Sequence, residues 1–102
     1  MTHFKALTAA ALALGLAGCQ MSTSSLEQTT RDAAKAVVGP IVADTVPGPA
    51  GVVLTDCIID HASLEELARL AAGGGSPENI TLVSNILSRP ETVACATSGL
   101  TG

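Results

Sequence analysis

Residues 63–95 read SLEELARLAAGGGSPENITLVSNILSRPETVAC, and this stretch carries the helix signals that decide the fold. Ser63-Leu64-Glu65-Glu66 is a capping-box pattern, in which a serine at the helix start is followed three residues later by a glutamate. Gly73-Gly74-Gly75 ends that helix, and Ser76-Pro77 begins the next, because serine caps a helix and proline suits its first position. Arg89-Pro90 ends the second helix and opens a third. The stretch therefore predicts consecutive short helices.

Between these signals, apolar residues recur at helical spacing. We expect the first of the three helices to bury Leu67, Leu70 and Ala71. We expect the second to bury a face made of Ile80, Val83, Ile86 and Leu87, widened by Leu82. The third helix is short and carries Val93, Ala94 and Cys95.

Toward the N-terminus, apolar or small residues recur every three or four positions from Leu26 to Val46, which also indicates a helix. Gly39-Pro40 interrupts it, since proline lacks an N–H and crowds the carbonyl four residues before it. Because the apolar pattern continues in phase past Pro40, we predict one kinked helix rather than two. The Pro-Gly-Pro-Ala-Gly stretch at residues 47–51 is predicted to be a loop.

Val52-Val53-Leu54 has the composition of a short strand, but no other segment alternates polar and apolar residues to pair with it. We therefore expect Thr55 or Asp56 to cap a short helix that turns Cys57 and the two isoleucines after it inward. The predicted fold class is all-α, with one long Pro-kinked helix and three or four short helices, stapled by one disulfide.

The first eighteen residues have the pattern of an export signal. Lys5 gives a short positive start, and Ala6 to Leu16 is an uncharged run of eleven residues, too short to span a bilayer. Leu16-Ala17-Gly18-Cys19 resembles the lipobox of bacterial lipoproteins. The resemblance implies cleavage before Cys19 and lipid attachment to its sulfur. The alternative is an ordinary signal peptide that ends at a chance cysteine.

This resemblance divides the chain into three parts. Residues 1–18 are the expected lipoprotein signal peptide, residues 19–25 the lipidated N-terminus and polar tether, and residues 26–102 the helical domain. The expected location is the bacterial cell envelope, anchored in a membrane through Cys19 and facing the periplasm. Gln20 in place of aspartate resembles the outer-membrane sorting pattern of well-known lipoproteins.

With Cys19 expected to carry the lipid, two cysteines are left to pair, Cys57 and Cys95. Thiols exported past the inner membrane meet oxidising conditions, in which disulfides persist. We therefore predict a Cys57–Cys95 bond. The alternative is a reactive Cys57 paired with His61, four residues further on.

The composition excludes several classes of function. The 102 residues carry five Lys and Arg against nine Asp and Glu, and this net charge of −4 argues against nucleic acid as a partner. Trp and Tyr are absent, so no aromatic platform can stack on bases or sugars. After cleavage one His remains, and no catalytic motif is present. We expect no enzymatic activity and no cofactor.

The densest polar cluster is Asp56, Cys57, Asp60 and His61. On a helix, Asp56 would lie one turn from Asp60, and Cys57 one turn from His61. These side chains suit a metal, but two carboxylates with one Cys–His pair would be an unusual zinc site. The competing interpretation has Cys57 oxidised, both aspartates facing solvent and His61 ending the helix. Gly73-Gly74-Gly75-Ser76 lacks the lysine of a phosphate-binding loop, so we interpret it as a hinge.

The stretch from Thr55 to Thr92 resembles small secreted bacterial proteins, and this resemblance implies no activity. We interpret the chain as a lipid-anchored envelope protein with a structural or protein-interaction role and an envelope protein as its partner. The alternative is a small periplasm-facing ligand or metal binder that uses Asp56, Asp60 and His61; a minimal envelope hydrolase is a third class. If a binding surface exists, we expect it on an exposed apolar stripe of the long helix, made of Val37, Val38, Ile41 and Val42.

Overall fold

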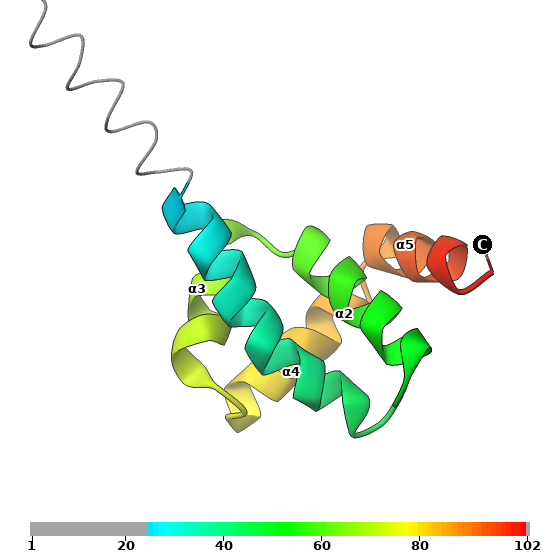
Figure 1. Ribbon diagram of the computed structural model, residues 1–102, viewed down its shortest axis with the longest axis horizontal. Helices are drawn as coiled ribbons and strands as arrows, with labels where there is room; N and C mark the ends of the chain where they lie inside the picture. The colour runs from blue at the N-terminus through cyan, green and yellow to red at the C-terminus, as the bar shows by residue number, and fades with distance from the viewer. Residues whose placement is uncertain (1–24, 102) are drawn as a thin grey trace, which may run out of the picture.

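The computed structural model describes residues 25–101, which form five helices and no strand. A long helix covers residues 25–43. It is followed by α2 (Pro49–Asp60), α3 (Leu64–Gly73), α4 (Pro77–Leu87) and α5 (Pro90–Thr101). Figure 1 shows α5 beside α2, α3 on the other side of the bundle, and α4 running between them behind the long helix. The all-α prediction of one long helix with three or four short ones is confirmed, and the short helices number four among residues 25–101.

The long helix continues through Pro40 to residue 43, so one helix rather than two is confirmed. It ends three residues earlier than the apolar pattern predicted. The carbonyl of Val42 accepts hydrogen bonds from the backbone N–H groups of both Thr45 (3.1 Å) and Val46 (2.8 Å). This tight turn closes the helix and directs the chain back toward α2.

The predicted loop at residues 47–51 is wrong in its second half, because α2 begins at Pro49 rather than near Thr55. Gly48 precedes the helix with a φ of 80°, a conformation that glycine adopts at little cost. Pro49 then occupies the first turn, where its missing N–H costs nothing. Gly51 packs so closely on the preceding turn that an added Cβ would lie 2.1 Å from the carbonyl oxygen of Val46.

The start signals of α3 and α4 are confirmed. The hydroxyl of Ser63 accepts a hydrogen bond from the N–H of Glu66 (3.2 Å), and the Glu66 carboxylate accepts one from the N–H of Ser63 (2.9 Å). Ser76 caps α4 by accepting from the N–H of Asn79 (3.3 Å), with Pro77 at the first position. Both helices therefore begin where the sequence predicted.

The buried face of α4 differs from the prediction at two positions. Ile80 is 48% exposed, whereas Asn79 is buried. The Asn79 amide donates to the carbonyls of Leu70 (3.1 Å) and Gly74 (2.7 Å), so it satisfies backbone oxygens at the end of α3. This polar contact sets the rotation of α4 and moves Ile80 away from the core.

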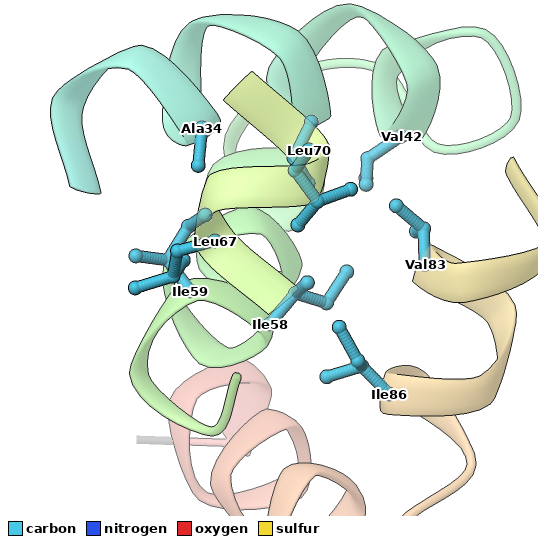
Figure 2. Close-up of a cluster of buried hydrophobic side chains, with 9 residues drawn as sticks. Ala34, Val42, Ile58, Ile59, Leu67, Leu70, Val83 and Ile86 are labelled. Carbon is cyan, nitrogen blue, oxygen red and sulfur yellow. The ribbon is translucent and has the colours of Figure 1, made fainter. Parts of the chain in front are cut away.

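The core gathers aliphatic side chains from the long helix, α2, α3 and α4 (Figure 2). Its most buried large members are Ile58, Leu70, Ile86 and Val38. Val38 is fully buried and Val42 is 7% exposed, so the predicted exposed stripe is wrong at these two positions. The inner half of that stripe is core, and the outer half, Val37 and Ile41, is half-buried.

Candidate functional site

The predicted lipidation residue, Cys19, and the lipobox lie outside the described residues. Among residues 25–101, no helix is both long enough and apolar enough to cross a membrane. The chain is already helical at residue 25, the first described residue, and the division before residue 26 stays a prediction.

Cys57 and Cys95 form the predicted disulfide, with their Cα atoms 5.7 Å apart. The bond joins the middle of α2 to the middle of α5 and encloses α3 and α4. Cys57 is 3% exposed, so the α2 end of the bond lies within the core. The alternative of a reduced Cys57 beside His61 is therefore wrong, because this sulfur is held in the disulfide.

Asp56 and Asp60 each contact a cation of the long helix. Lys35 approaches Asp56 to 2.7 Å, and Arg31 approaches Asp60 to 2.6 Å. The hydrogen bond and the charge of Asp56 raise the pKa of Lys35. All four side chains are between about 39% and 56% exposed, so the pairs align two helices and contribute little stability.

His61 follows the last residue of α2, as the simpler interpretation predicted, and its N–H donates to the carbonyl of Cys57 (3.2 Å). Across the described part of the chain, no three His, Cys, Asp or Glu side chains are grouped to hold a metal ion. Asp56 and Asp60 line the same polar hollow, where each contacts a cation, and His61 does not join them in a group of three ligands. A ligand at these residues stays a prediction that a metal titration would test.

The strongest polar contact joins Glu66 of α3 to Arg89, between α4 and α5. The two guanidinium nitrogens donate to the two carboxylate oxygens at 2.9 Å and 2.5 Å, and Arg89 also donates to the carbonyl of His61 at 2.9 Å. The Arg89 hydrogen bonds lower the pKa of Glu66 to about 2, helped by the N–H of Ser63 and opposed by partial burial. This single cation therefore joins the α2–α3 junction to the α4–α5 junction.

Sequence reasoning missed this pair. It assigned Glu66 to the capping box, which is correct, but 23 residues separate Glu66 from Arg89. Local charge patterns on a helix report only pairs three or four residues apart. Because the pair connects the ends of neighbouring helices, we assign it a structural role.

An apolar groove lies between the second half of the long helix and α4, with a volume of about 800 Å³. Asp44 is the one charged residue among the described residues that line it. Its apolar lining includes Val37, Ile41, Val46, Leu54, Ile80 and Leu87. The outer half of the predicted stripe, Val37 and Ile41, thus lines one wall, and the exposed Ile80 lies on the other.

Comparison with known proteins gave no match to a family model, to a curated protein or to a solved structure.

Proposed function

We propose that the chain is a lipid-anchored protein of the bacterial cell envelope whose helical domain binds another envelope protein without catalysis. The location rests on the lipobox resemblance of Leu16-Ala17-Gly18-Cys19 and on the outer-membrane pattern at Gln20. The Cys57–Cys95 disulfide supports export, because such bonds persist in oxidising compartments outside the cytoplasm.

The observation that carries the binding role is the apolar groove. A small soluble domain normally exposes single apolar side chains rather than a continuous hollow lined by them. Here aliphatic residues of the long helix, α2 and α4 line one groove, and Ile80 stands nearly half exposed on its wall. Asp44 is the one charged residue in the described lining of the groove. The groove would therefore bind a partner through apolar side chains that the partner presents.

Fatty-acid labelling tests the anchor. Label should attach to the wild-type protein and be lost in Cys19→Ala. Wild-type protein recovered without lipid and with Met1 still present would refute the proposed location.

Photo-crosslinking in cells tests the groove. A photoreactive amino acid at position 80 should form an adduct with one envelope protein, and Val37→Ser in the same chain should abolish that adduct while helicity is kept. Position 93 of α5 is the matched control, because Val93 is 49% exposed and Ile80 is 48% exposed. Equal adducts at both positions, or none at position 80, would contradict a role for the groove.

A further inference from the structure

Two large apolar side chains stand exposed where the described chain begins. Leu26, near the start of the described part of the long helix, is 67% exposed, and Leu64, the first residue of α3, is 53% exposed. The Arg31–Asp60 contact of 2.6 Å joins the early described turns of the long helix to the last residue of α2, just before α3 begins. Figure 1 shows the described start of the long helix and the start of α3 in the same half of the domain.

The long helix loses its packing partners toward this end. Leu26, Thr30 and Val37 follow one another at spacings of four and seven residues, which places them on one flank of the helix. Thr30 and Val37 are half-buried, whereas Leu26 is two-thirds exposed. The flank that is half-buried further along therefore has an uncovered apolar residue at Leu26.

The length of chain before Leu26 limits what can cover it. Cys19 precedes Leu26 by seven residues, which span at most about 25 Å when fully extended. With the acyl chains of the proposed anchor in a bilayer, Leu26 stays within about 25 Å of the lipid surface. This limit on distance rests on the proposed function. A bilayer is thus always within reach of Leu26, whereas a partner protein is not.

The charges at this end do not favour electrostatic attraction to anionic lipids. Arg31 and Lys35 each contact an aspartate, and Glu27 and Asp32 add negative charge to the same turns. Polybasic segments bind anionic headgroups, and none is present among the described turns here. Contact with the bilayer would instead be apolar, through side chains that enter the interfacial region.

We propose that Leu26 and Leu64 enter the bilayer interface and fix the orientation of the domain on the membrane. The described part of the long helix then leads away from the lipid surface. The apolar groove, which uses residues 36–46 at the far end of this helix, lies further from the membrane, where a partner can reach it.

Spin labelling of the lipidated protein tests this orientation. Cys57 and Cys95 are joined and Cys19 carries the lipid, so a cysteine introduced by Leu26→Cys, Leu64→Cys or Val93→Cys is the only free thiol. Each variant is labelled with a nitroxide and reconstituted into vesicles of phosphatidylcholine and phosphatidylethanolamine. Labels at positions 26 and 64 should collide more with oxygen, which concentrates in lipid, and less with a water-soluble nickel chelate than the label at position 93.

The outcomes separate this proposal from the anchor. Protein whose mass shows no lipid refutes the anchor, and the proposed orientation falls with it. Lipidated protein whose label at position 26 meets the nickel chelate as often as the label at position 93 overturns the orientation alone. A label at position 26 shielded from both reagents also overturns it, because the leucine is then buried against a second copy of the chain.

Discussion

Replacing Glu66 by glutamine isolates the ion pair with Arg89 from the capping box that Glu66 also completes. Glutamine keeps an oxygen that can accept from the N–H of Ser63, and it serves at this position of capping boxes. It removes the negative charge that two guanidinium nitrogens contact at 2.9 Å and 2.5 Å. The change therefore tests the pair that joins the start of α3 to the junction of α4 and α5.

The magnitude follows from the pKa of Glu66, which is lowered from 4.5 to about 2. One pKa unit corresponds to about 1.4 kcal/mol, so the pair and its hydrogen bonds stabilise the fold by at most about 3 kcal/mol at neutral pH. The Glu66 side chain is 15% exposed and that of Arg89 is 36% exposed, so water screens part of this energy. We expect Glu66→Gln to cost about 1–2 kcal/mol.

The pH dependence has a defined sign. Because the folded-state pKa of Glu66 is below its unfolded value, the stabilisation is complete above about pH 4.5 and is lost as the pH falls toward about 2. Urea denaturation followed by far-UV circular dichroism, with the disulfide intact, measures the free energy of unfolding of both proteins. The difference between wild type and Glu66→Gln should shrink across this range and vanish below it.

Glu65→Gln is the matched control. Glu65 adjoins Glu66, is 77% exposed and pairs with Arg69 one turn along α3, so its loss should cost no more than about 0.5 kcal/mol. Equal costs for the two variants at neutral pH would refute the reasoning. A Glu66→Gln deficit that persists undiminished at about pH 2 would refute it as well.

Four further stability changes can be measured by the same denaturation. Reducing the Cys57–Cys95 bond, which spans 38 positions, should cost about 4 kcal/mol, because the unfolded chain regains the entropy of a long loop; an unchanged midpoint would contradict this. Thr92→Val should stabilise by about 1 kcal/mol, since the Thr92 hydroxyl is buried and has no hydrogen-bond partner among the described residues. Gly51→Ala should cost about 1–3 kcal/mol through its clash with the preceding turn, whereas Gly39→Ala, with open space around its Cα, should stabilise the long helix by about 0.5–1 kcal/mol.

Local signals explain what the sequence predicted correctly. Ser63 and Ser76 satisfy N–H groups three residues away, so their helix starts depend on side chains that are neighbours in sequence. The disulfide was predictable because the expected lipid occupies Cys19, which leaves two cysteines and therefore one intramolecular pair. These features need no knowledge of how the helices pack.

The sequence predictions were wrong where the packing of the helices against one another determines which residues are buried. Asn79, which is polar, is buried because its amide meets carbonyls at the end of α3, and this contact turns Ile80 toward solvent. Val38 and Val42 belong to the core because α2, α3 and α4 cover that side of the long helix. The start of α2 at Pro49 had a local signal, proline at a first helical position, but the neighbouring glycines suggested a loop. The apolar groove is lined by residues of the long helix, α2 and α4, so the sequence pattern of any one helix cannot reveal it.

The Cys57–Cys95 bond also governs how the folded chain carries mechanical tension. A pull on the two ends of the described chain enters α2, crosses the disulfide and leaves through α5, so the force bypasses α3 and α4. The bypassed loop would add about 130 Å of contour length if it could be drawn out. Tension can unwind the long helix and the first half of α2, but it cannot extend the loop while the sulfur–sulfur bond is intact. After reduction of the disulfide, the same force would pass through α3 and α4, and the chain could be stretched much further.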